Sequence, residues 1–194
     1  MSLEFLRAYA YVAVLLLLPA VLVLVAQFSW RWTLVALAVQ FLAAAWLVSL
    51  NWPLTLALVK LVVGWMAGAV LATAQAGTIE PAEPLSGRLF RVVAASLLLV
   101  ALYTVFTPVQ EWLRVDPAIL AGALILIGAG LVQVSMTAQP LRVGIGLLTF
   151  LTGFEVLYAA LELSVLVAGL LAVVNLGLAL AVAYLLPGEP REAA

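Results

Sequence analysis

The sequence predicts an all-α integral membrane protein with seven transmembrane helices. Of its 194 residues, 68% are hydrophobic and only 9% are charged, against roughly 25% charged residues in a typical soluble domain. The mean hydropathy is +1.30. A soluble fold of this size has too little interior to bury so much apolar surface. The apolar stretches are continuous rather than alternating, which favours helices over the strands of a transmembrane barrel.

Seven apolar stretches approach the length of a membrane-spanning helix, which needs about 20 residues. In chain order, we expect helices at residues 8–26, 32–50, 54–74, 89–107, 117–136, 141–161 and 163–186. The first stretch follows Arg7 as the core of a signal peptide would, but it is too long and lacks a cleavage site, so we interpret it as a retained helix. The last two stretches contain only Glu155 and Glu162 as charges, and we expect a tight reversal near Glu162.

The basic residues in the loops predict the orientation. With seven spans, two arginines lie on the amino-terminal side and five on the opposite side: Arg7 and Arg114 against Arg31, Arg88, Arg91, Arg142 and Arg191. Basic residues accumulate in short cytoplasmic loops. We therefore expect the amino terminus outside and the carboxyl terminus in the cytoplasm, in the inner (cytoplasmic) membrane.

A hydrophilic segment divides the chain into two membrane units. Residues 1–74 form a three-helix unit, residues 75–87 a cytoplasmic connector, and residues 88–186 a four-helix unit. Residues 187–194 are expected to be a disordered tail. Each unit has an arginine at the cytoplasmic start of a helix, as a faint internal duplication would produce.

The composition excludes several kinds of chemistry. The chain has no histidine and no cysteine, so it has no axial imidazole for haem, no thiolate for an iron–sulfur cluster and no ordinary zinc site. Nucleophilic sites of the Ser–His–Asp or Cys–His kind are excluded for the same reason. A net charge of −1 without a basic tract argues against nucleic-acid binding. We expect no catalytic residue, no metal and no cofactor on this chain.

Two charged residues fall inside predicted helices rather than at their ends. Lys60 lies in the helix at 54–74 and Glu155 in the helix at 141–161. A charge at the centre of a spanning helix costs roughly 2.5–3.5 kcal/mol on insertion scales, so such residues are candidates for functional sites. Both lie about 9 Å from the outer end of their helix. This matched depth allows Lys60 and Glu155 to pair, directly or through water.

Three interpretations of these two residues stay open from the sequence. They can form a static pair that fixes how two helices dock. Alternatively, Lys60 extends outward to the interface and Glu155 is protonated. In the third interpretation, both residues exchange protons with a file of water. We favour the third by a small margin, because ionisable residues inside a membrane are functional candidates by default.

Other polar residues are weaker candidates. Glu162 lies seven residues after Glu155, and it would share its face if the helix continued that far. A solvated carboxylate in the outer turn is the favoured interpretation of Glu162. Asn175, near the middle of the last helix, is expected to form a hydrogen bond between helices, as are Gln40 and Gln133.

Glycines are frequent inside the predicted helices. Gly64 and Gly68 have GxxxG spacing, and eight further glycines fall in the last three spans: Gly122, Gly128, Gly130, Gly144, Gly146, Gly153, Gly169 and Gly177. In lipid, small residues allow two helix backbones to approach closely. We therefore expect these glycines to mark helix–helix contacts and the last three helices to form the tightest bundle.

The chain resembles component E of the hydrogenase-4 type membrane complexes. The resemblance rests on seven spans with a proline-containing cytoplasmic loop after the third, on Lys60 in the third helix, and on Arg142 followed 13 residues later by Glu155 in the sixth. The last three helices look like the small K-type subunit of respiratory complex I and the C subunit of Mrp antiporters. Asn175 stands where the resemblance leads us to expect an acidic residue in the final helix.

The resemblance implies a non-catalytic subunit of a redox-driven proton or sodium pump. Its partners would be antiporter-like and other membrane subunits, with the redox centres on other chains. Lys60 and Glu155 would be ion-coupling groups, with Glu162, Asn175 and Arg142 as secondary candidates. One alternative is a structural or assembly scaffold with a static Lys–Glu pair. A stand-alone small-solute transporter ranks lower, because such proteins usually have helices broken near the midplane, whereas Pro19 and Pro53 lie close to the ends of the predicted spans.

Overall fold

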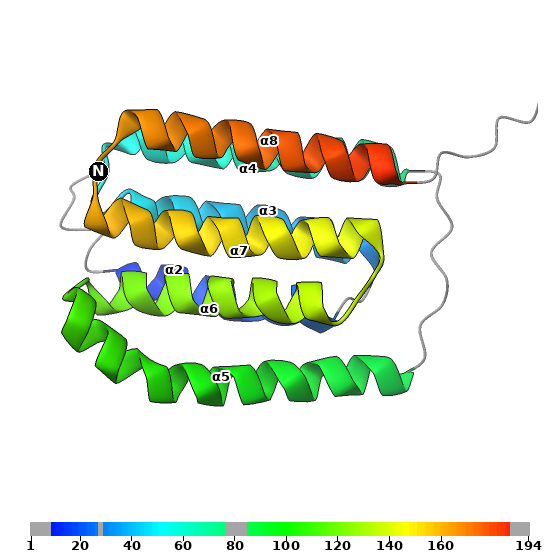
Figure 1. The fold of residues 1–194 in the computed structure, drawn as a ribbon, viewed down its shortest axis with the longest axis horizontal. Coiled ribbons are helices and arrows are strands. Elements are labelled where there is room, and N and C mark those ends of the chain that lie inside the picture. The colour runs from blue at the N-terminus through cyan, green and yellow to red at the C-terminus, as the bar shows by residue number, and fades with distance from the viewer. Residues whose placement is uncertain (1–8, 27–28, 77–84, 187–194) are drawn as a thin grey trace, which may run out of the picture.

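The computed structural model describes residues 9–26, 29–76 and 85–186. All regular secondary structure in these ranges is helical (Figure 1), and each predicted span corresponds to one helix. In chain order these are α2 (Ala10–Ala26), α3 (Trp30–Val48), α4 (Leu54–Gln75), α5 (Leu85–Leu113), α6 (Pro117–Ser135), α7 (Pro140–Leu161) and α8 (Val165–Leu185). Helices α3 to α8 are long and apolar enough to cross a bilayer, whereas α2 is apolar but has only 17 residues. The chain is thus a multi-pass helical membrane protein.

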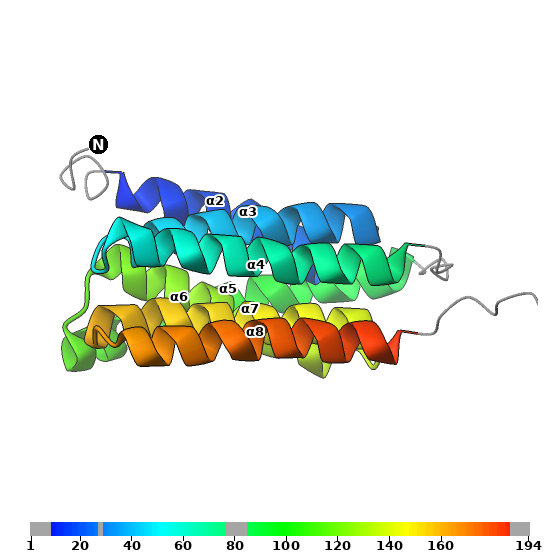
Figure 2. The same cartoon turned by 90° about the horizontal axis from the view of Figure 1, so that it is seen from above.

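The helices form two layers, with α5 beside them. One layer contains α2, α3 and α4, and the other contains α6, α7 and α8 (Figures 1 and 2). Across the layers, α2 contacts α6, α3 contacts α7, and α4 contacts α8. Helix α5 packs on α6 and α2 at one edge. Residues that are far apart in the sequence therefore meet between the layers.

The helix boundaries follow local sequence signals. The Asp116 carboxylate caps α6 by accepting a hydrogen bond from the Ala118 amide at 2.9 Å. The predicted reversal near Glu162 is confirmed, because α7 ends at Leu161 and α8 begins after Ser164. At the residue just before a helix, a serine or aspartate side chain accepts a hydrogen bond from an amide that the first helical turn leaves unpaired.

Two prolines lie inside helices, where the sequence predicted them at or beyond helix ends. Helix α5 was predicted to end at residue 107, but it continues through Pro108 to Leu113. A proline removes one helical hydrogen bond and bends the helix without having to end it, and α5 changes direction near this end in Figure 1. Pro19 lies inside α2 rather than near a helix end. The positions of the prolines therefore disfavour a transporter less strongly than the sequence indicated.

The glycine prediction holds for α6 and α7 but not for every helix. A Cβ added at Gly130 would lie 2.5 Å from the Phe150 amide nitrogen, and one at Gly153 would lie 2.7 Å from the Ile127 nitrogen. These two backbones are therefore in direct contact. In contrast, a Cβ at Gly68, Gly169 or Gly177 would meet no described atom within 4 Å. The expectation that the last three helices form the tightest bundle holds for α6 and α7 but not for α8, most of whose surface is exposed.

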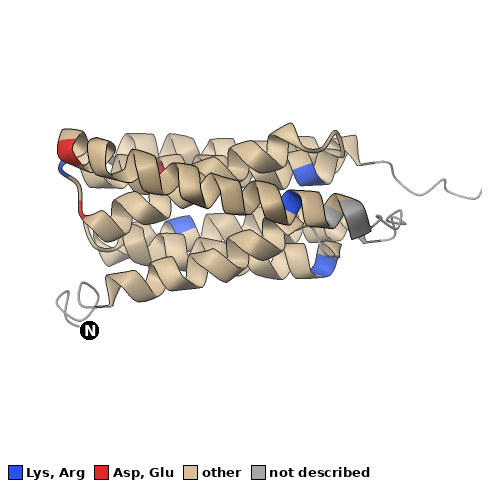
Figure 3. Cartoon of the chain, turned by 90° about the horizontal axis from the view of Figure 1, so that it is seen from below, with Lys and Arg blue, Asp and Glu red and all other residues tan. Residues whose placement is uncertain are grey.

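Charged side chains gather at the two ends of the bundle (Figure 3). Among the described residues, three arginines lie at the end where α3, α5 and α7 begin: Arg31, Arg91 and Arg142. At the other end lie one arginine and three acidic residues: Arg114, Glu111, Asp116 and Glu162. Arg7, Arg191, the tail at 187–194 and most of the predicted connector lie outside the described residues. Lys60 and Glu155 are the exceptions to this distribution among the described residues.

Candidate functional site

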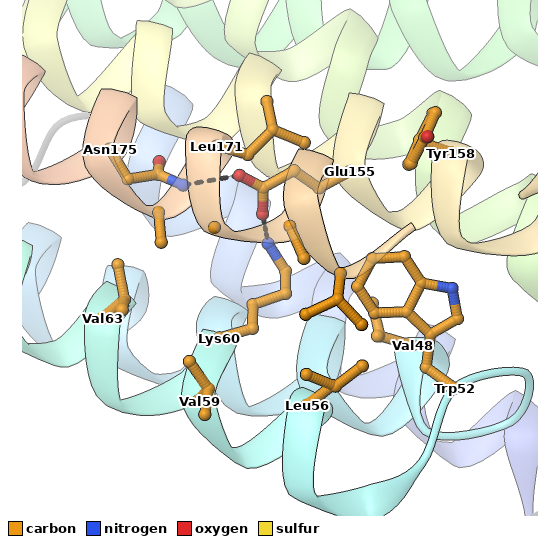
Figure 4. Close-up of a pocket in the computed structure, with 14 residues that line it drawn as sticks. Val48, Trp52, Leu56, Val59, Lys60, Val63, Glu155, Tyr158, Leu171 and Asn175 are labelled. Atoms are coloured by element: carbon orange, nitrogen blue, oxygen red, sulfur yellow. Dashed lines mark hydrogen bonds and ion pairs between the residues drawn. The ribbon is translucent and has the colours of Figure 1, made fainter. Parts of the chain in front are cut away.

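Lys60 of α4 and Glu155 of α7 form an ion pair inside the bundle (Figure 4). Lys60 lies six residues after Leu54, and Glu155 lies six residues before Leu161. Their side chains are only 12% and 8% exposed. The direct contact that the matched depths allow is present. Because the ammonium points to Glu155, the interpretation in which Lys60 extends outward to the interface is wrong.

Asn175 of α8 completes the cluster. Its side-chain Nδ2 donates a hydrogen bond of 2.5 Å to Oε1 of Glu155, while Lys60 pairs with Oε2. Asn175 is 3% exposed. The carboxylate therefore ties together α4, α7 and α8, and thus both layers of the bundle. The sequence predicted an interhelical hydrogen bond for Asn175 but did not identify Glu155 as its partner.

A cavity of about 160 Å³ lies next to this cluster. Its walls come from α3, α4, α7 and α8 and are apolar except at the cluster and two aromatic residues: Val48, Trp52, Leu56, Val59, Lys60, Val63, Glu155, Tyr158, Val165, Ala168, Gly169, Leu171, Ala172 and Asn175. The Trp52 indole N–H donates to the backbone oxygen of Glu162 at 3.1 Å. This bond joins the turn after α3 to the turn after α7 at the end of the cavity away from Asn175.

Two secondary candidates lie apart from the cluster. Glu162 is exposed in the turn between α7 and α8, and its carboxylate accepts a 3.3 Å hydrogen bond from the Tyr158 hydroxyl. Because α7 ends at Leu161, Glu162 does not continue the helical face of Glu155. Arg142 is buried in the first turn of α7, about 20 Å along the helix from Glu155.

Buried polar side chains continue along α7 from Glu155 towards Arg142. Thr152 donates to the backbone oxygen of Leu148 at 2.6 Å, and the Thr149 hydroxyl lies 3.2 Å from Oε1 of Gln40 on α3. Gln40, Thr149 and Thr152 are fully buried. The expectation that Gln40 joins two helices is confirmed. Its Nε2 has no hydrogen-bond partner among the described residues.

The cluster places a proton donor, the Lys60 ammonium, beside a proton acceptor, the Glu155 carboxylate. No group of three or more Asp, Glu, His or Cys residues that could hold a metal ion occurs in the described ranges. Each carboxylate oxygen of Glu155 already faces a nitrogen donor. An ammonium beside a carboxylate can instead transfer a proton, which converts two charges into two neutral groups. Burial in a low-dielectric interior removes the hydration of both ions.

The fold and the cluster thus define the class: a multi-pass helical membrane protein with a buried ion pair between its helices. Comparisons with protein families, with curated proteins and with solved structures found no match.

Proposed function

We propose that this chain is a non-catalytic subunit of a membrane complex in which Lys60 and Glu155 exchange protons on an ion-coupling path. The observation that carries the proposal is a buried ion pair beside a cavity, between helices of both layers. A hydrophobic pair of similar volume often stabilises a protein as well as a buried ion pair does. A role in docking alone therefore gives little reason for two ionisable groups at this depth.

The proposed step is a proton transfer within the pair. A proton leaves the Lys60 ammonium and binds a carboxylate oxygen of Glu155, which gives an amine and a carboxylic acid with no change in net charge. The neutral groups are no longer held by ionic attraction, so each can exchange its proton with water. Asn175 does not titrate, and its role is to orient the Glu155 carboxylate.

Polar groups on both sides of the pair support a path. The cavity extends from the cluster towards Trp52, and Lys60, Glu155 and Asn175 are among the residues that line it. A buried water molecule needs two to four polar partners. On the other side, Thr152 and the Gln40–Thr149 contact supply buried polar atoms towards the opposite end of the bundle.

The choice of complex rests on the resemblance to hydrogenase-4 component E. It supports a redox-driven proton or sodium pump in the inner membrane, with antiporter-like subunits as partners. Helices α5 and α8 have mostly exposed, apolar surfaces that neighbouring subunits or lipid can cover. A static scaffold remains the principal alternative, because the pair joins α4 to α7 whichever role it has.

Replacing Glu155 by Gln in the assembled complex tests the proposed function. The amide keeps the size of the side chain and can still bond to Asn175, but it cannot take up a proton. We expect the complex purified in mild detergent and reconstituted in liposomes to transfer fewer ions per electron, measured with a pH-sensitive dye. Glu111→Gln, an exposed carboxylate at the end of α5, is the matched control and is expected to pump normally.

Three outcomes would contradict parts of this proposal. Unchanged ion transfer per electron in Glu155→Gln would show that the pair is not part of the path. Full pumping in the reversed double variant Lys60→Glu/Glu155→Lys would identify a static docking pair. Absence of any co-purifying subunit would overturn the assignment to a complex.

We also propose that all seven helices cross the membrane, with the amino terminus outside. The three arginines at the end where α3, α5 and α7 begin support a cytoplasmic location of that end. The 17 residues of α2 reach the lower limit for a spanning helix, and α2 lies alongside α3 in both views (Figures 1 and 2).

Single introduced cysteines provide a direct test of orientation, because the chain has no cysteine of its own. Asn51→Cys lies in the exposed turn after α3, and Ala138→Cys lies in the exposed turn before α7. In intact cells, a membrane-impermeant maleimide should label Asn51→Cys and should label Ala138→Cys only after lysis. The reverse labelling pattern would show the opposite orientation.

A further inference from the structure

A second hollow, of about 250 Å³, lies on the surface of the bundle between α3 and α4, which run side by side (Figure 2). Its apolar walls include three residues of each helix: Leu34, Val35 and Ala38 of α3, and Trp65, Gly68 and Ala72 of α4. Val35 is 53% exposed and Trp65 is 49% exposed, so the hollow is an open groove that faces the lipid. A Cβ added at Gly68 would meet no described atom within 4 Å. The groove therefore exists where small side chains leave a gap between two helices.

Arg31 lies at one end of this groove, in the first turn of α3. It precedes the three groove residues of α3 by three, four and seven positions, a spacing that places side chains on one face of a helix. Its guanidinium lies over the ring of Trp30, 5.4 Å from the centroid, and Trp30 packs against the core cluster that contains Leu71 of α4. The guanidinium is thus turned towards the side of α3 that faces α4. Arg31 is exposed and forms no ion pair with a residue that the structure describes.

Tryptophans indicate how the groove lies in the membrane. Trp30 and Trp32 flank Arg31, and tryptophan is enriched where the membrane meets water. Arg31 therefore lies at the level of the lipid headgroups. At the deep end of the groove, the Trp65 indole N–H donates to the Ala38 backbone oxygen at 3.2 Å, so this ring bridges the two helices. From Arg31 to Ala38 the groove runs about 10 Å along α3 into the hydrocarbon layer.

We propose that this groove binds one anionic phospholipid, whose phosphate pairs with Arg31 and one of whose acyl chains lies along the groove towards Trp65. The planar N–H donors of a guanidinium match the oxygens of a phosphate. An acyl chain fills the gap beside Gly68 and makes the dispersion contacts that the small side chains leave unmade. In a zwitterionic lipid, the headgroup cation offsets the attraction to Arg31, so the site selects a headgroup with net negative charge. This inference does not depend on ion coupling, because neither Lys60 nor Glu155 lines the groove.

Native mass spectrometry of the full chain, purified in detergent and stripped of lipid, tests the proposal. The two probes are dioleoyl phosphatidylglycerol, which is anionic, and dioleoyl phosphatidylcholine, which has the same acyl chains but is zwitterionic. We expect the first phosphatidylglycerol molecule to bind about fivefold more tightly than the first phosphatidylcholine molecule. This ratio corresponds to the contribution of about 1 kcal/mol from one basic residue near the membrane surface. Equal affinity of the unmodified chain for the two lipids would overturn the proposal.

A charge variant tests the headgroup contact. Arg31→Gln is expected to bind the two lipids with equal affinity, because the group that distinguishes them is gone. Arg114→Gln is the matched control, since it also removes one exposed arginine, but at the opposite end of the bundle. This control should keep the fivefold preference. A preference for phosphatidylglycerol that survives in Arg31→Gln would contradict the assignment of the headgroup to Arg31.

A groove variant separates this site from a general attraction of anionic lipid to basic residues. Gly68→Leu keeps Arg31 but fills the groove, and we expect its affinity for phosphatidylglycerol to fall to that for phosphatidylcholine. Gly177→Leu is the matched control, because its surroundings on α8 are equally open but it lies outside the groove. It should bind both lipids as the unmodified chain does. If Gly68→Leu kept the full preference, the lipid would be held by surface charge alone, and the groove would not be its site.

Discussion

Replacing either member of the Lys60–Glu155 pair by Met is expected to destabilise the bundle by about 3–5 kcal/mol, because the remaining group becomes an unpaired buried ion. Met has nearly the same length as Lys and Glu, so little cavity is created. In Glu155→Met, Asn175 also loses the acceptor of its hydrogen bond. Thermal unfolding in detergent, followed by circular dichroism, measures the loss for each variant.

The double variant Lys60→Met/Glu155→Met separates an unpaired charge from general damage to the packing. With both charges removed, we expect stability close to that of the unmodified chain, and the double-mutant cycle should show strong coupling. Glu111→Met, at the exposed end of α5, is expected to have little effect. If the two single variants were as stable as the unmodified chain, the ion pair would not be a buried contact of the folded protein.

The helices and the central pair could be predicted because both depend on position along the chain alone. A run of apolar residues long enough to cross lipid must form a helix, since no water is present to satisfy its backbone. Lys60 and Glu155 were found by counting residues from the ends of two helices. The same counting was less successful for α5, which was expected to end at residue 107 but continues through Pro108 to Leu113.

The contact of Asn175 and the cavity could not be predicted, because they depend on where side chains point and on where a glycine leaves space. Asn175 lies ten residues into α8, deeper by about 6 Å than Lys60 in α4, so matching depths did not connect it to Glu155. Only the structure shows that the two side chains reach each other. Gly169 was interpreted as a contact between helices, but it lines a cavity. A glycine in a membrane helix gives the same sequence signal for a close contact and for an open space.

Alanine substitutions at these two kinds of glycine are expected to change the stability of the bundle in opposite directions. Gly130→Ala on α6 is expected to destabilise the bundle by about 1–3 kcal/mol, the usual cost of overpacking. Its Cβ would lie 2.6 Å from the Gly146 oxygen and 2.7 Å from the Phe150 Cα, both backbone atoms of α7. Backbone atoms cannot rotate away as a side chain can, so α7 must move outward as a whole.

Gly68→Ala is the matched variant on α4, where the added Cβ would meet no described atom within 4 Å. There, only the lower flexibility of alanine remains, and we expect a gain of up to about 1 kcal/mol. Thermal unfolding of the two variants measures this difference. Because α7 carries Glu155, an outward shift in Gly130→Ala should also weaken the Lys60–Glu155 pair, so combining it with Lys60→Met should cost less than the sum of the two separate losses. Equal effects of Gly68→Ala and Gly130→Ala would contradict direct backbone contact between α6 and α7.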